Sequence, residues 1–73
     1  MSVTRVAKRS LDIAGHRTSV SLEAPFWEAL GDIAARRGQS LAALVAEIDR
    51  SRDPETNLSS ALRVFVLAQY RSG

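Results

Sequence analysis

The sequence contains no cysteine, and none of its apolar runs approaches the roughly 20 residues of a membrane-spanning helix. Without cysteine the chain can form neither disulfides nor thiolate metal sites, which fits a reducing compartment. The N-terminal stretch MSVTRVAKRSLDIAG also lacks the unbroken apolar core of a signal peptide. We therefore expect a cytoplasmic protein without a membrane partner.

Motifs for catalysis and cofactor binding are equally scarce. The single histidine, His16, has no second histidine or cysteine with which to share a metal. The chain has no phosphate-cradling glycine loop and no nucleophile elbow, and 73 residues leave little depth for a water-excluding pocket. The sequence thus argues against an enzyme, and it predicts no metal, no cofactor and no small-molecule ligand.

The chain is long enough for one small domain, but not for a large core. A domain of this length buries only about 60% of the surface that its unfolded chain exposes. Other sources of stability, such as disulfides or metals, are not expected from this composition. Oligomerisation is therefore the expected additional source of stability.

Positive charge gathers near the N-terminus, although the net charge is only +2. The first 17 residues hold one acid, Asp12, against four basic residues: Arg5, Lys8, Arg9 and Arg17. This distribution has the right sign for contact with a polyanion such as DNA. Residues 1–9 show no clear period, so we expect a flexible basic arm there and a folded domain over residues 10–71.

The segment HRTSVSLE, residues 16–23, alternates in polarity as a half-buried strand does. Thr18, Val20 and Leu22 fall on one face, opposite a polar face. A lone strand must find a hydrogen-bonding partner, either in this chain or in a second copy. Residues 10–14 also alternate, and a tight turn at Gly15 and His16 would pair Ile13 with Thr18 and Leu11 with Val20. Both the in-chain hairpin and the two-chain ribbon remain open.

Three helices are expected after the strand, over residues 25–37, 41–49 and 58–71. Pro25 suits a first helical turn, and Gly38 suits a helix end. Ser40 and Asn57 are candidate N-caps of the next two helices. The first helix should turn Phe26 or Trp27 toward the core. The third contains VFVLA, which is apolar on nearly every side, so a second subunit is the expected cover.

This order of alternating strand, helix, glycine turn and Ser-capped helix resembles the ribbon-helix-helix family of DNA-binding proteins. The closest likeness is to small bacterial members with an additional C-terminal helix, matched here by NLSSALRVFVLAQYR. The resemblance implies a mainly helical fold with a short β ribbon, built as an intertwined homodimer with one strand and three helices per chain. The sequence leaves open whether an extra N-terminal strand joins this fold.

The resemblance also implies that two chains pair their strands and insert the ribbon into the DNA major groove as a transcriptional regulator. The implied base contacts are Arg17, Ser19 and Ser21. The implied phosphate contacts are Lys8, Arg9, His16, Gln39 and Ser40. The implied dimer core consists of Val20, Leu22, Trp27, Leu30, Leu44, Val45, Ile48, Leu62 and Phe65.

One outward residue, Glu23, does not suit a face that meets DNA, because a carboxylate repels phosphates. An acidic residue there and the modest net charge also suit a dimerisation or protein-interaction module that uses the same fold without DNA. A third alternative is an antitoxin-like protein, whose ribbon binds DNA while its C-terminal part neutralises a partner.

Overall fold

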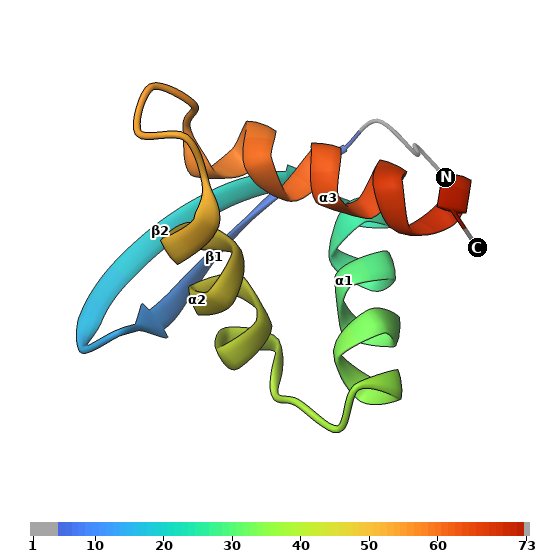
Figure 1. Ribbon diagram of the computed structural model, residues 1–73. Coiled ribbons are helices and arrows are strands. Elements are labelled where there is room, and N and C mark those ends of the chain that lie inside the picture. The colour runs from blue at the N-terminus through green and yellow to red at the C-terminus, as the bar shows by residue number, and fades with distance from the viewer. Residues whose placement is uncertain (1–4, 73) are drawn as a thin grey trace.

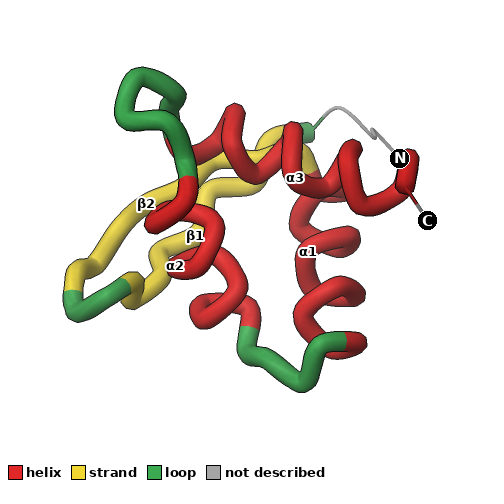
Figure 2. Tube along the Cα trace, in the orientation of Figure 1, coloured by secondary structure: helices red, strands yellow, loops and turns green. Residues whose placement is uncertain are grey.

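The computed structural model describes residues 5–72, which form a two-stranded antiparallel ribbon followed by three helices (Figures 1 and 2). The elements are β1 (Val6–Ile13), β2 (His16–Glu23), α1 (Ala24–Arg36), α2 (Leu41–Ser51) and α3 (Leu58–Ser72). The mainly helical class with a short β ribbon is therefore confirmed, and so is the extra N-terminal strand.

The strand partner of β2 is β1 of the same chain. The turn lies at Ala14 and Gly15, one residue earlier than predicted, and both residues have positive φ, 52° and 86°. Positive φ at both central residues is what a tight hairpin turn of type I′ requires. The register is therefore two residues from the predicted one, with Leu11 opposite Thr18. Because the displacement is even, every side chain keeps its predicted face.

Residues 6–9 of the predicted flexible arm, residues 1–9, belong to a strand, because β1 begins at Val6. Val6 pairs with Glu23, and Arg9 pairs with Val20. The hydrogen bonding continues to Arg5, whose carbonyl oxygen accepts from the backbone N–H of Ala24 at 3.0 Å. The backbone N–H and C=O groups of β2 require hydrogen-bonding partners along its whole length. For this reason β1 extends into the residues that were expected to form the arm. Residues 1–4 lie outside the described residues.

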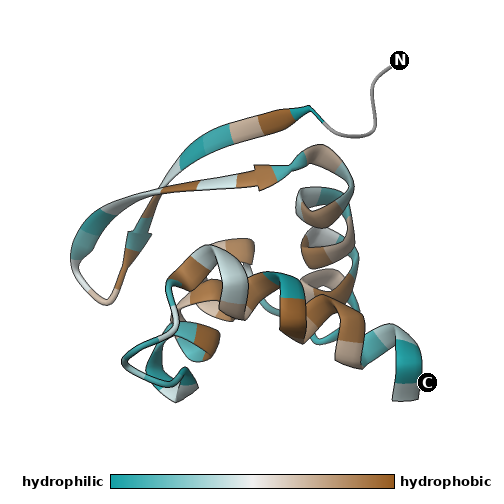
Figure 3. Cartoon of the chain, turned by 90° about the horizontal axis from the view of Figure 1, so that it is seen from above, coloured by the Kyte–Doolittle hydropathy of each residue, from teal (hydrophilic) through white to brown (hydrophobic). Residues whose placement is uncertain are grey.

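All three helices pack on one side of the hairpin (Figure 3). The second helix, α2, packs against β1, whereas α1 and α3 pack against β2. Trp27 of α1 joins the layers, because its indole N–H donates to the carbonyl oxygen of Ala7 at 2.8 Å. The buried core comprises Ile13, Val20, Leu22, Trp27, Leu30, Ile33, Ala34, Leu44, Val45, Ile48, Leu62 and Val66.

The residues expected to form a dimer core are mostly buried within one chain. Eight of those nine belong to the buried core, and the ninth, Phe65, is half-buried. One chain therefore buries most of these residues without a partner, and their place in a dimer interface stays a prediction. An in-chain strand occupies the position beside β2 that the family resemblance assigned to a partner's strand.

The helix boundaries follow the predicted signals closely. The hydroxyl of Ser40 accepts from the N–H of Ala43 at 3.0 Å, and Oδ1 of Asn57 accepts from the N–H of Ser60 at 2.8 Å. Both are N-cap bonds of the expected kind. In α1 it is Trp27, not Phe26, that is fully buried.

The third helix is buried on one stripe only. Leu62 and Val66 face the core, but Val64, Leu67 and Tyr70 are 64%, 55% and 55% exposed. The chain itself therefore leaves apolar surface on α3 uncovered. Even this helix, with 15 residues the longest one within residues 5–72, is too short to cross a membrane, and the other two are shorter still.

The turn offers a test of the hairpin. Ala14 is the one non-glycine residue with positive φ in the described part of the chain. Asparagine tolerates this conformation better than alanine, so Ala14→Asn should stabilise the fold by roughly 0.5–1 kcal/mol. Chemical denaturation measures the change. The control Ala35→Asn, at an exposed position of α1, should destabilise by about 0.5 kcal/mol. A loss of stability in Ala14→Asn would contradict the turn.

Candidate nucleic-acid interface

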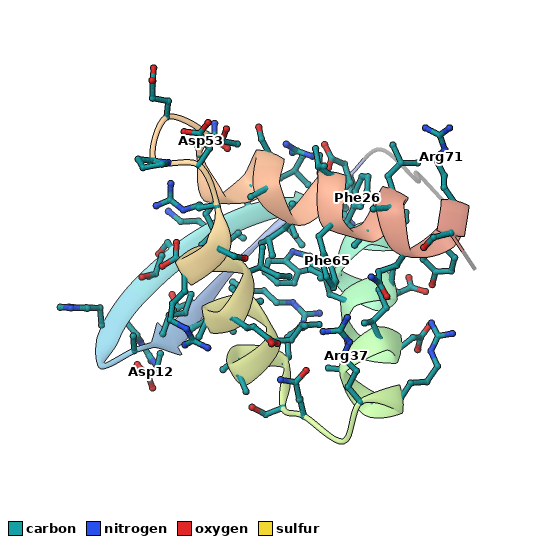
Figure 4. All side chains as sticks on the ribbon, in the orientation of Figure 1. Asp12, Phe26, Arg37, Asp53, Phe65 and Arg71 are labelled. Atoms are coloured by element: carbon teal, nitrogen blue, oxygen red, sulfur yellow. The ribbon has the colours of Figure 1, made fainter. Side chains whose placement is uncertain are left out.

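The hairpin presents one face away from the helices, which we call the outer face. It consists of four cross-strand pairs, which run from the tip to the base of the hairpin: Asp12 with Arg17, Ser10 with Ser19, Lys8 with Ser21, and Val6 with Glu23. Only Glu23 among these residues is partly buried, and the others are exposed. Asp12 lies near the tip, at the end of the molecule far from Arg71 of α3 (Figure 4).

The three residues predicted to contact bases lie together on this outer face. Arg17 forms an ion pair with Asp12, at 3.1 Å between Nη1 and Oδ1. Both side chains are about 70% exposed, at 69% and 74%, and exposed pairs of this kind contribute little to stability. Arg17 can therefore exchange Asp12 for another partner at small cost. Ser19 and Ser21 are exposed beside it.

The predicted phosphate contacts on the hairpin do not share one face. Lys8 lies on the outer face opposite Ser21, and no ion pair of Lys8 occurs within residues 5–72. Arg9 instead lies on the inner side, where its guanidinium carbon is 5.2 Å from the centre of the Trp27 ring. His16 is exposed directly after the turn. Of the three, Lys8 alone is placed beside the candidate base contacts.

The N-terminus of α2 holds the other two predicted phosphate contacts. Ser40 caps the helix, as expected, through its hydroxyl. The amide of Gln39 donates to Glu47 at 3.2 Å, and Arg37 lies 3.7 Å from the same carboxylate oxygen. An acid therefore already engages the Gln39 amide, so a phosphate would have to displace it. The phosphate role of Gln39 and Ser40 stays a prediction.

Glu23, one of the two acidic residues of the outer face, has a partner that sequence reasoning missed. Arg63 of α3 donates to both carboxylate oxygens of Glu23, at 2.9 Å from Nε and 3.2 Å from Nη2. These hydrogen bonds hold the pKa of Glu23 below its ordinary value. The two residues are 40 positions apart, and no local pattern in the sequence could connect them. The pairing neutralises a carboxylate that would otherwise repel DNA phosphates.

A second contact binds the same end of β2 to α3. The hydroxyl of Ser59 donates to the carbonyl oxygen of Ser21 at 3.0 Å. Because Ser59 and Arg63 are one turn apart on α3, they hold adjacent parts of β2. The base of the hairpin is thereby fixed to the helical layer, while its tip extends beyond it (Figure 1).

Comparison with known proteins shows to which family a chain with this arrangement belongs. The family described as "Ribbon-helix-helix domain" matches residues 6–70. The chain belongs to this family. Ribbon-helix-helix proteins are usually DNA-binding transcription regulators, are generally not enzymes, and generally bind DNA as dimers. Within the described residues, no three histidine, aspartate or glutamate side chains gather to hold a metal ion.

One solved structure is similar over nearly the whole chain. It is that of an uncharacterized protein from Bordetella pertussis Tohama I, with a TM-score of 0.76 and 36% sequence identity. The match covers 96% of this chain and 58% of that one, so our ribbon-helix-helix chain spans little more than half of its relative's length. No curated protein matches the chain.

The ion pair between Glu23 and Arg63 predicts a pH dependence of stability. Because folding lowers the pKa of Glu23, the pair stabilises the fold at neutral pH, and this contribution is lost as the pH falls through the lowered pKa. Glu23→Gln should therefore unfold at lower denaturant concentration than the wild type at pH 7. At strongly acidic pH the two proteins should converge.

The control for this experiment is Glu28→Gln. Glu28 lies at an exposed position of α1 and forms no ion pair within residues 5–72. It should leave the difference between neutral and acidic stability as in the wild type. A Glu23→Gln deficit that persists unchanged at acidic pH would show that the ion pair is not its cause.

Proposed function

We propose that this ribbon-helix-helix protein is a sequence-specific DNA-binding protein and a transcriptional regulator, which places the outer face of its ribbon in the major groove. The observation that carries the proposal is the exposure of Arg17, Ser19 and Ser21 on one face of a two-stranded ribbon. Strands in a ribbon lie about 4.8 Å apart, and the major groove is about 12 Å wide. A two-stranded ribbon therefore fits the groove.

The side chains of the outer face suit base recognition. Arg17 can donate two hydrogen bonds to O6 and N7 of guanine, the geometry in which arginine selects this base. The hydroxyls of Ser19 and Ser21 can donate or accept at short reach. Lys8 suits a phosphate at the rim of the groove. Contacts of Arg9, His16, Gln39 and Ser40 with phosphates remain predictions, as does a cytoplasmic location.

The competing function is a protein-interaction module that uses the fold without DNA. The modest net charge of +2 is the feature that favours it. Salt dependence separates the two functions, because phosphate contacts release counterions and make affinity fall steeply with salt. Absence of binding to duplex DNA even at low salt would favour the interaction module.

The DNA test is a fluorescence titration over a salt series, on an operator first selected from random duplexes. Arg17→Ala should weaken specific binding by roughly 1–3 kcal/mol and relax one base preference. Lys8→Ala should weaken binding to all sequences alike and reduce the salt slope by about 1. If Arg17→Ala weakened binding equally on every DNA sequence, Arg17 would not be a specificity residue.

We also propose that the chain forms a homodimer through the exposed side of α3. The ribbon is complete within one chain, so strand pairing does not require a second copy. The uncovered apolar residues Val64, Leu67 and Tyr70 lie on α3. Val64 also lines an open groove of about 480 Å³ together with Ile48 and Phe65. Burial of this apolar surface by a second chain would give the dimer that the family generally uses on DNA.

The dimer surface can be tested with one charge. Leu67→Glu places a carboxylate in the proposed contact, so it should convert the protein to a monomer at micromolar concentration. Light scattering should give twice the 7.9 kDa of one chain for the wild type and a single chain for the variant. Ala35→Glu, an equal charge at an exposed site of α1, should stay dimeric. A wild type that is monomeric at tens of micromolar would refute the dimer.

A further inference from the structure

The pairing pattern of the hairpin determines which side chains meet on its outer face. In antiparallel pairs, hydrogen-bonded and non-hydrogen-bonded positions alternate along the strands. Ile13 and His16 close the two-residue turn and form a hydrogen-bonded pair, so the next pair, Asp12 with Arg17, is non-hydrogen-bonded. The contact from Ser59 to the carbonyl oxygen of Ser21 agrees with this pattern, because that oxygen must point away from β1.

All pairs of the outer face are therefore of the non-hydrogen-bonded kind. In such pairs the Cα atoms are about 4.5 Å apart and the side chains approach most closely. Ser10 of β1 thus lies directly beside Ser19 of β2, and Lys8 lies directly beside Ser21. The side chains of β1 and β2 form one continuous surface rather than two separate rows.

The middle of this surface is small and polar. Ser10 and Ser19 are exposed, and their short side chains let the backbone approach a surface closely. Two adjacent hydroxyls can present a donor and an acceptor together. Adenine offers the complementary pair in the major groove, an acceptor at N7 beside a donor at N6.

We propose that the DNA-reading surface is complete in one protomer and that Ser10 is a base-contacting residue of it. This inference rests on the proposed DNA binding. Ser10 and Ser19 together read an A·T pair. Arg17 reads a neighbouring nucleobase toward the tip of the hairpin, and Lys8 holds a phosphate toward the opposite end of the hairpin, where it joins the helices. The pairs from Arg17 to Lys8 span about 14 Å along the strands. A ribbon assembled from the β2 strands of two chains would leave Ser10 without this role.

The first experiment tests the strand pairing independently of DNA. The chain has no cysteine, so Ser10→Cys combined with Ser19→Cys creates the sole pair of thiols. Facing residues of a non-hydrogen-bonded pair lie at a separation that a disulfide can bridge. Mild oxidation should give an internally bridged single chain on a non-reducing gel. The control pair, Ser10→Cys with Ser72→Cys, should not bridge internally. Exclusive cross-linking between chains through residues 10 and 19 would overturn the proposal.

The second experiment tests the role of Ser10 in recognition. Ser10→Asp places a carboxylate in the groove and should raise the Kd for the operator more than tenfold. The matched control Ser72→Asp adds the same charge at the far end of α3 and should change the Kd less than twofold. The milder variant Ser10→Ala should lower the preference for A·T over G·C at one position about fivefold, with circular dichroism unchanged.

The outcomes separate the two proposals. If Arg17→Ala weakens binding but Ser10→Asp behaves like Ser72→Asp, DNA binding by β2 stands and the inference about Ser10 is wrong. If the wild type binds no duplex DNA at low salt, DNA binding and the role of Ser10 fail together, whatever the cross-linking result.

Discussion

The hydrogen bonding of β2 is the constraint on which the rest of the structure depends. A strand with one polar face and one apolar face cannot leave its backbone groups without partners. Here β1 supplies them over the full length of β2, from Ile13 opposite His16 to Val6 opposite Glu23. With its partner in the same chain, the ribbon can lay its apolar face on three helices, and one chain encloses its own core.

Sequence patterns predicted the elements well because their signals are local. The caps at Ser40 and Asn57, the alternation in β2 and the apolar stripes of the helices all depend on neighbours within about four residues. The faces of the hairpin were also predicted correctly. Its register was not, because Ala14 accepts a positive φ that alanine normally avoids, and no rule of composition places a turn there.

The candidate site could be predicted only in part, because several of its contacts join residues that lie far apart in the sequence. Alternation alone puts Arg17, Ser19 and Ser21 on one face. The contribution of β1 depends on the register, and the neutralisation of Glu23 depends on Arg63, which a separate helix brings to it. The inward position of Arg9 over Trp27 likewise follows from β1 extending into the predicted arm. These features need the tertiary fold.

The two contacts at the base of the hairpin have a mechanical consequence. Ser59 and Arg63 hold the last residues of β2 from successive turns of α3, so a tilt of this helix must carry the ribbon with it. If two chains join through α3, the angle between their ribbons is then set by rigid helices and not by a flexible linker. Each of the two ribbons would then contact one half of a two-part DNA site, and the geometry of the α3 contact would determine the spacing between the halves. A substitution in the α3 contact would change this spacing.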